Sequence, residues 1–497
     1  MDFLNLFVAV PVLTVIGIMF TKDLKGARIV SAIGMGIQLI LSAYLVFYYL
    51  SLQGVGDLHN MIFYADTVWY APLNIHYTIG VDGIAVAMIA LTGIVVFAGI
   101  FASWKMEYLP REFFISLIIL ATGVFGFFIS LDLFTMLMFY ELAVIPMYLL
   151  IGIWGTGPKE RSAMKLTLML MAGSALLVVG LLGIYFNSAA PGGTYTFNMV
   201  EIVKHQMPIA AQRFFFPLTF VGFGVLGALF PLHTWSPDGH ASAPTAVSML
   251  HAGVLMKLGA YGCFRVAMYL MPQAAHQLAW IFIILTSISV VYGAFGAIKQ
   301  KDLKFINAYS SVSHVGLILF ALLMMNTTAI DGAILQMISH GLMTALFFAL
   351  IGMIYGRTHT RDIDKMGGLL KIIPFLGVMY IIAGFASLGL PGFSGFVAEM
   401  TIFVGAFQHA DMFHRVATIV VVSSIVVTAV YILRVVGIML LGPLKNQEHA
   451  KLTDATWFER VSTITLVIAI AGIGIVPLWL SDTIQRSLHP LLQMILH

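Results

Sequence analysis

The chain consists largely of apolar stretches about twenty residues long, separated by short polar connections. A helix that crosses a membrane needs ~20 mostly apolar residues, because the hydrocarbon core is ~30 Å thick and a helix rises ~1.5 Å per residue. The 497 residues are 60% hydrophobic and only 9% charged, whereas soluble domains carry about 25% charged residues. These features predict an all-α integral membrane protein without a soluble domain. We expect fourteen membrane-spanning segments, near residues 3–20, 29–50, 81–103, 113–130, 133–153, 165–187, 214–232, 243–270, 277–298, 305–325, 328–356, 373–406, 416–441 and 461–480.

The distribution of basic residues supports this count. With fourteen spans, the loops on one side carry 18 of the 25 lysines and arginines, and the loops on the other side carry five. Loops rich in lysine and arginine face the cytoplasm, so we expect both termini on the outer side of a bacterial inner membrane. The longest polar stretches, 51–80 and 188–212, also fall on the outer side. The second contains FNMVEIVKHQM, which predicts a short amphipathic helix on the surface. The five outer basic residues are Lys204, Arg213, Arg265, Arg415 and Arg486.

Three ionisable residues stand alone in apolar segments: Glu141 in the fifth span, Lys257 in the eighth and Glu399 in the twelfth. Charged side chains are costly inside a membrane, so they usually face the interior of a helix bundle and mark an ion or proton path. A simpler alternative exists for each residue. Glu141 could be a neutral packing carboxyl, Lys257 could extend to the interface, and Glu399 could be a carboxylate at a helix end.

Two spans are expected to be broken near these residues. Segment 214–232 runs into GALFPLHTWSPDGHASAP, and segment 373–406 contains ASLGLPGFSGF. Proline and glycine interrupt helical hydrogen bonding, and the freed backbone groups must be satisfied by protein or by a water-filled cavity. Paired interruptions in the two halves of a transporter indicate its translocation path. An ordinary proline kink is the alternative at either break.

Three further spans carry histidines: His251, His314 and His340. Imidazole titrates near pH 6.5 and can pass a proton between its two nitrogens, so three intramembrane histidines predict a proton relay. Each could instead be a packed hydrogen-bonding residue. No HxxxH or HxxE spacing joins them, and we expect no metal site. A desolvated lysine and a nearby carboxylate alter each other's affinity for protons, so joining or separating such a pair would capture or release one.

Motifs for an energy source are missing from the sequence. No GxGxxG dinucleotide motif and no P-loop are present, and the single cysteine, Cys263, cannot ligate an iron–sulfur cluster alone. We therefore expect no cofactor on this chain. The energy for transport would come from partner subunits or from an ion gradient.

Several segments together resemble one family. FYELAVIPMYLLIGIWG, PLHTWSPDGHASAPTAVSMLHAGVLMKLGAYG, KQKDLKFINAYSSVSHVGLIL, QMISHGLMTALFF and LPGFSGFVAEMTIF are similar to subunit M of bacterial respiratory complex I. This NADH-quinone oxidoreductase subunit is the counterpart of mitochondrial subunit 4 and belongs to the antiporter-like superfamily. The resemblance implies two inverted five-helix repeats, at 113–270 and 271–441. A three-helix segment, 1–112, would precede them, and a C-terminal helix, 442–497, would follow.

The resemblance also implies a function and roles for residues. The chain would translocate protons in the membrane arm, coupled to electron transfer from NADH to quinone on other subunits. FMN, iron–sulfur clusters and quinone would be bound by those partners, which include neighbouring antiporter-like subunits. Glu141 would be the fifth-span glutamate and Lys257 the eighth-span lysine. His314 and His340 would be relay groups, and Glu399 the exit-side glutamate.

One position departs from the family pattern. Relatives usually carry a lysine in the seventh span that pairs with the fifth-span glutamate, but here that position is Leu226. We hypothesise that His251 takes over part of this work, as a relay or as a partner for Glu141. Two alternatives remain: a subunit of a multi-subunit sodium/proton antiporter, and a non-pumping spacer in the membrane arm.

Overall fold

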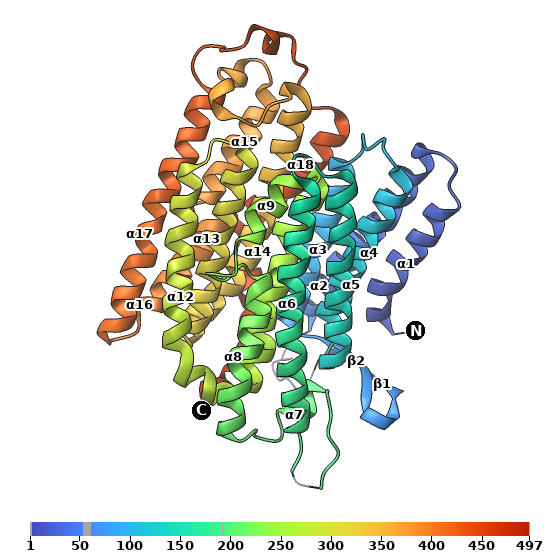
Figure 1. Cartoon of the computed structure of the whole chain (residues 1–497), viewed down its shortest axis with the longest axis vertical. Helices are drawn as coiled ribbons and strands as arrows, with labels where there is room; N and C mark the ends of the chain where they lie inside the picture. Colours follow the sequence, from blue (N-terminus) through green and yellow to red (C-terminus); the bar gives the residue numbers. More distant parts are fainter. Residues whose placement is uncertain (1, 53–60, 191, 497) are drawn as a thin grey trace.

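The protein is a bundle of roughly parallel helices, described by a computed structural model over residues 2–52, 61–190 and 192–496 (Figure 1). Within these residues, twelve helices are long and apolar enough to cross a membrane, which confirms the prediction of an all-α multi-pass membrane protein. They are α2 (Leu24–Ser51), α3 (Gly83–Ala102), α4 (Pro110–Ile129), α5 (Leu133–Trp154), α6 (Lys159–Phe186), α8 (Ile209–Leu226), the composite segment Thr245–Met268, α12 (Pro272–Lys299), α13 (Leu303–Leu323), α14 (Thr327–Thr358), Met412–Leu440, which begins with α17 (Met412–Val435), and α18 (Trp457–Ile475).

Three apolar helices in the described residues are shorter. These are α1 (Leu6–Met19), α15 (Pro374–Ser387) and α16 (Ser394–Phe407). The expected span 373–406 is therefore two helices joined by a turn. Gly389 and Gly392 have φ angles of +61° and +95° in that turn, a conformation that glycine adopts without steric cost.

The centre of the bundle is formed by α3, α13, α14 and the composite segment Thr245–Met268. In these elements 78% to 100% of the most apolar window is buried by protein. The outermost helices, α2 and α17, have 33% of that window buried. A helix that is apolar all round suits either lipid or a protein core, so the sequence alone could not separate the central helices from the peripheral ones.

A strand pair and a short helix lie at one end of the bundle, drawn at the bottom of Figure 1. There β1 (Ile62–Tyr70) and β2 (Ile75–Val81) form an antiparallel hairpin that pairs Thr67 with Tyr77. The expected surface helix within 197–207 is α7, a short helix over Met199–Ile202. Residues 53–60 of the polar stretch 51–80 lie outside the described residues.

Asp132 lies at the same end, between α4 and α5. Its carboxylate accepts hydrogen bonds from the backbone N–H groups of Phe134, Thr135 and His76 and so caps α5. Burial raises the pKa of this carboxyl to about 6, although these hydrogen bonds favour the ionised form. The Asp132 carboxylate therefore joins the start of α5 to strand β2.

The C-terminal part of the chain forms two helices where one span was expected. The expected last span, 461–480, is divided: α18 ends at Ile475, and α19 (Leu478–Leu496) follows. Helix α19 carries polar side chains that dock onto distant elements. Ser487 Oγ lies 2.8 Å from the Tyr49 hydroxyl and accepts from the Gly83 N–H at 2.7 Å, so α19 packs against the start of α3.

A buried ion pair corrects one assignment from the sequence. Arg265, counted with the outer basic residues although it falls within the expected span 243–270, lies in the last turns of the composite segment with 2% of its surface exposed. Its Nη2 donates to Asp82 Oδ2 at 2.6 Å, and its guanidinium lies over the ring of Tyr261. The pair ties the composite segment to the start of α3.

We expect Asp82→Asn to destabilise the protein strongly. Removing one partner of a buried ion pair leaves an uncompensated charge, which costs about 3–5 kcal/mol. The matched control is Glu201→Gln, because Glu201 pairs with Lys204 at the same distance of 2.6 Å but on the surface. That change should alter the free energy of unfolding by at most about 1 kcal/mol. Thermal unfolding in detergent compares the two variants, and equal losses would contradict the expectation.

Candidate functional site

Lys257 lies at the centre of the bundle, in a segment that departs from regular α-helix. The segment consists of α10 (Thr245–Leu250), a π-helical turn (His251–Leu255), α11 (Met256–Gly262) and a second π-helical turn (Cys263–Met268). Such turns widen the helix and occur often at functional sites. Lys257 Nζ donates to the carbonyl of Ala252, five residues earlier, and Lys257 is fully buried. The local geometry thus supplies an acceptor for an otherwise isolated ammonium.

The first link from Lys257 leads to α14. Lys257 Nζ lies 2.8 Å from His340 Nδ1. Because the ammonium can only donate, Nδ1 of His340 accepts and its hydrogen is on Nε2. The ring of His340 stacks on that of His314 from α13, with 5.2 Å between the centroids. Lysine and two imidazoles therefore follow one another across three elements.

The second link leads from α13 to α16. His314 Nδ1 lies 3.6 Å from Glu399 Oε1, and Gln336 bridges the two. The Gln336 amide nitrogen is 3.2 Å from His314 Nδ1 and 3.5 Å from Glu399 Oε1. Lys257, His340, His314 and Glu399 are each at most 8% exposed. The sequence prediction that these four residues face the bundle interior is therefore correct, and we call them the buried polar chain.

The break between α15 and α16 positions Glu399. A Cβ atom added to Gly389 would lie 2.8 Å from Glu399 Oε2, and one added to Gly395 would overlap the Ala386 carbonyl oxygen. The turn thus folds back tightly against the glutamate. Glycine suits position 389, because its φ angle is positive and an added Cβ would press against the Glu399 carboxylate.

A small cavity adjoins the last link of the chain. Its lining includes His314, Glu399 and the hydroxyl-bearing residues Ser387, Ser424 and Thr428. These hydroxyls place polar groups next to the Glu399 carboxylate.

His251 points into the protein and contacts other aromatic rings. Its ring stacks on Trp235 at 5.0 Å and lies 4.4 Å from the ring of His240. Trp235 belongs to α9 (Trp235–Ser242), the short helix after the first break, and its Nε1 donates to the Val225 carbonyl near the end of α8. Both nitrogens of His251 are buried without a partner among the described residues. His251 therefore lies in the bundle interior, in contact with the rings of Trp235 and His240.

Glu141 is not part of the buried polar chain. It is partly exposed on α5, on the face that also carries the exposed Met138 and Ile145. Within the described residues, no hydrogen bond or ion pair reaches its carboxylate.

Leu226 is buried as the last residue of α8. The next residue, Gly227, touches Gly259 of α11 so closely that a Cβ on Gly259 would lie 2.5 Å from the Gly227 nitrogen.

Sequence reasoning missed three buried polar residues. Gln336 bridges His314 and Glu399. A glutamine inside an apolar span could have been recognised from the sequence. Lys304 donates to the Ala243 carbonyl at 2.5 Å, beside the first break, although it was counted as a loop charge. Asp331 accepts from Gln485 at 2.8 Å and was overlooked inside the expected span 328–356.

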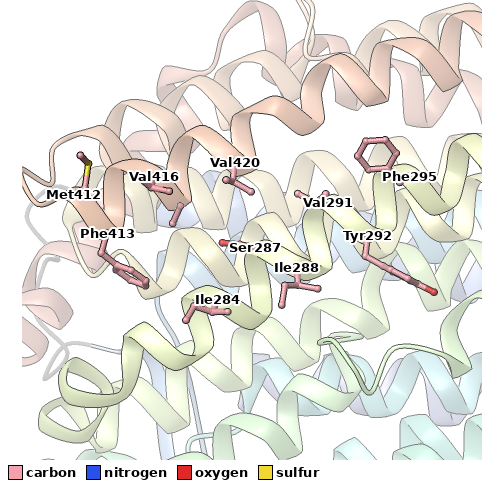
Figure 2. Close-up of a pocket in the computed structure, with 11 residues that line it drawn as sticks. Ile284, Ser287, Ile288, Val291, Tyr292, Phe295, Met412, Phe413, Val416 and Val420 are labelled. Carbon is pink, nitrogen blue, oxygen red and sulfur yellow. The ribbon is translucent and has the colours of Figure 1, made fainter.

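A large apolar groove lies away from the buried polar chain, between α12 and the segment that starts with α17. Figure 2 shows Ile284, Ile288 and Tyr292 of α12 facing Met412 and Val416 of α17 across it. Several of these side chains are exposed. Without charged or titratable groups other than a tyrosine in its lining, the groove is a surface for lipid-like groups rather than a proton path.

Comparison with known proteins identifies relatives across the whole chain. The family model described as "NADH:quinone oxidoreductase/Mrp antiporter, TM" matches residues 130–428. The "NAD(P)H-quinone oxidoreductase chain 4 1" of Nostoc sp. is 33% identical over 97% of this chain and 89% of its own length. The "NAD(P)H-quinone oxidoreductase chain 4 2" of Thermosynechococcus vestitus is 35% identical over 82% of this chain and 77% of its own length.

Solved structures share the fold over nearly the full length. A chain of respiratory complex I from Thermus thermophilus superimposes with a TM-score of 0.89 at 24% identity, covering 99% of both chains. A chain of the Mrp complex from Dietzia sp. superimposes with a TM-score of 0.82 at 19% identity, again covering 99% of both.

The turn at Gly389 yields a test of the site geometry. We expect Gly389→Ala to destabilise the protein by about 1–2 kcal/mol, because alanine is strained in the left-handed conformation and its Cβ meets Glu399. Gly472→Ala in α18 is the matched control, since nothing lies within 4 Å of its added Cβ. That change should stabilise α18 by up to about 1 kcal/mol. Thermal unfolding measures both, and a Gly389→Ala variant as stable as the parent would contradict the described turn.

Proposed function

The chain belongs to the NADH:quinone oxidoreductase/Mrp antiporter transmembrane family, and we propose that it is a proton-translocating subunit in the membrane arm of a complex I-type quinone reductase. Its curated relatives carry the name of chain 4 of such enzymes. Electron transfer takes place on partner subunits, which we expect to bind FMN, iron–sulfur clusters and quinone. The neighbouring antiporter-like subunits are the expected direct partners in the membrane.

The observation that carries this proposal is the buried polar chain from Lys257 to Glu399, in which ring stacking links His340 to His314. Lys257 Nζ gives a proton to His340 Nδ1 across 2.8 Å. His340 can then release a proton from Nε2 towards the stacked ring of His314, since imidazole uses both nitrogens. His314 Nδ1 faces Glu399 Oε1 at 3.6 Å. Every group can accept and release a proton, and together they cross from α11 to α16.

The exit for the proton is the hydroxyl-lined cavity beside Glu399. Ser387, Ser424 and Thr428 line it together with Glu399, and hydroxyls and water conduct protons through hydrogen bonds. The backbone groups freed by the break before α16 can be satisfied there. We propose that this cavity opens towards the outer side when Glu399 is protonated.

The topology follows from the same family. We propose that α1 and the pair α15 and α16 complete fourteen spans, arranged as inverted repeats at 113–270 and 271–441 between segments 1–112 and 442–497. Each repeat contains one break, after α8 and after α15, which supports the pairing of the two halves. Both termini would then lie on the outer side of the bacterial membrane, since the basic loops face the cytoplasm.

Entry of protons is assigned to the cluster of His240 and His251. Their rings lie 4.4 Å apart and are fully buried, close to the first break and to Lys304, which bonds the Ala243 carbonyl next to α9. Because Leu226 cannot take up a proton, these imidazoles provide the titratable groups on this side of Lys257. Glu141 acts separately, on the exposed face of α5, where a neighbouring subunit supplies its partner.

The two alternatives are less well supported. An antiporter subunit shares the fold, but the relatives at 33–37% identity are named as quinone oxidoreductase chains. A non-pumping spacer has no need for four linked ionisable groups in its core, because each is costly to bury.

Breaking the relay tests the proposal. We expect His340→Leu and His314→Leu to lower this subunit's proton transfer at least about tenfold, because loss of a positioned acid–base group removes that much or more. The number of protons translocated per electron should fall in inverted membrane vesicles that contain the whole complex. His205→Leu, in the turn after α7, is the matched control and should leave the ratio unchanged. An unchanged ratio in both relay variants would favour the spacer.

Variants of the two glutamates distinguish proton transfer through this chain from coupling to a neighbouring subunit. We expect Glu399→Gln to lower the proton-to-electron ratio, because the exit group can no longer ionise. Glu141→Gln should lower it as well if Glu141 couples the subunit to its partner. A fall with Glu399→Gln alone would place the path in the second half of the chain, and no fall with either change would rule out pumping by this subunit.

A further inference from the structure

Two histidines and an aspartate meet where α16 leads into α17: His409 and Asp411 lie in the turn, and His414 lies in the first turn of α17. His409 and His414 stack with ring centroids 4.2 Å apart and an angle of 14° between their planes. One nitrogen from each ring and one carboxylate oxygen of Asp411 all lie within 4.8 Å of one another. Among the described residues, this is the one group of three histidine, cysteine or acidic side chains with such spacing.

A hydrogen bond holds the ring of His409 in an orientation that leaves Nδ1 available to a metal ion. His409 Nε2 lies 2.7 Å from the Met324 carbonyl. A carbonyl can only accept, so Nε2 carries the hydrogen and Nδ1 presents its lone pair. Metal-binding histidines typically donate their second N–H to a carbonyl or carboxylate in this way, which fixes the tautomer and the ring orientation.

The ring of His414 is held by Asp411. His414 Nδ1 lies 2.8 and 2.7 Å from the two carboxylate oxygens, and the same carboxylate caps α17 by accepting from the His414 backbone N–H at 3.1 Å. Two donors on one tetrahedral zinc ion are about 3.3 Å apart, so a slight opening of this pair would admit a metal.

We propose that His409, Asp411 and His414 form a binding site for a divalent transition-metal ion of the Zn²⁺ class. Two imidazoles and a carboxylate are the donors that such ions prefer, and water would complete the tetrahedron. This departs from the expectation of no metal site, which considered only the spacing of the intramembrane histidines. The bound ion would join the end of α16 to the start of α17 and, through the Met324 carbonyl, to the end of α13.

The neighbouring residues give the site a structural setting. Asn326 Nδ2 donates to the Gly405 carbonyl at 2.9 Å, so the start of α14 is already bound to the end of α16 beside His409. Met412 and Phe413 lead from the site into the apolar groove of Figure 2. A metal here would therefore fix the outer end of the helix that carries Glu399.

Metal binding can be tested on the intact complex after treatment with a chelator. Titration with Co²⁺, followed by its visible absorption, should show a saturable tetrahedral spectrum that Zn²⁺ displaces. We expect His414→Gln and His409→Gln to weaken Co²⁺ binding tenfold or more. Asp411→Asn should also weaken it while preserving the helix cap, because the asparagine oxygen can still accept from the backbone N–H.

His205→Gln is the matched control, since it removes a partly exposed histidine from another turn at the same end of the bundle (Figure 1). Its Co²⁺ spectrum and affinity should equal those of the parent. Thermal unfolding of each variant identifies any loss of fold, and if a histidine variant unfolds, the Co²⁺ affinity of Asp411→Asn is the deciding measurement. Equal Co²⁺ affinity in the parent and in Asp411→Asn, or no saturable spectrum in the parent, would overturn the proposal.

Discussion

Backbone hydrogen bonding in the absence of water governs this architecture. In lipid every N–H and C=O must find a partner within the protein, which forces the chain into helices. Where a helix departs from regular geometry, polar groups become available, and the ionisable side chains gather there. Lys257 uses a carbonyl freed by a π-helical turn, and Glu399 lies against the glycine turn that divides α15 from α16. The two ends of the buried polar chain therefore lie at helix irregularities, whereas His314 and His340 lie in the uninterrupted helices α13 and α14.

The two halves of the molecule are unequal in their polar content. From Lys257 onward, donors and acceptors follow one another to a hydroxyl-lined cavity. Before Lys257, Leu226 fills the space at the end of α8, and the rings of His240 and His251 pack against each other. A hydrocarbon at position 226 removes one charge that would otherwise have to be desolvated. The two imidazoles also pack against Trp235 and Phe348.

The sequence was sufficient for the membrane class, for most span boundaries and for the burial of Lys257, His314, His340 and Glu399, because lipid disfavours an isolated polar group and drives it into the bundle interior. It was insufficient where tertiary contacts decide. The partner of Arg265 is Asp82, 183 residues away, which no local pattern reveals. Glu141 shows the opposite case: hydropathy marks it as intramembrane, but only the packing of α5 determines that its face is exposed.

The docking of α19 has a consequence for how the molecule is made. Its side chains bond residues near the beginning of the chain, with Ser487 contacting Tyr49 and Gly83, and residues of α14, with Gln485 contacting Asp331. These contacts join segments up to 438 positions apart. These contacts can form only after the whole stretch from Tyr49 to Ser487 has been synthesised. Contacts of such long range form slowly.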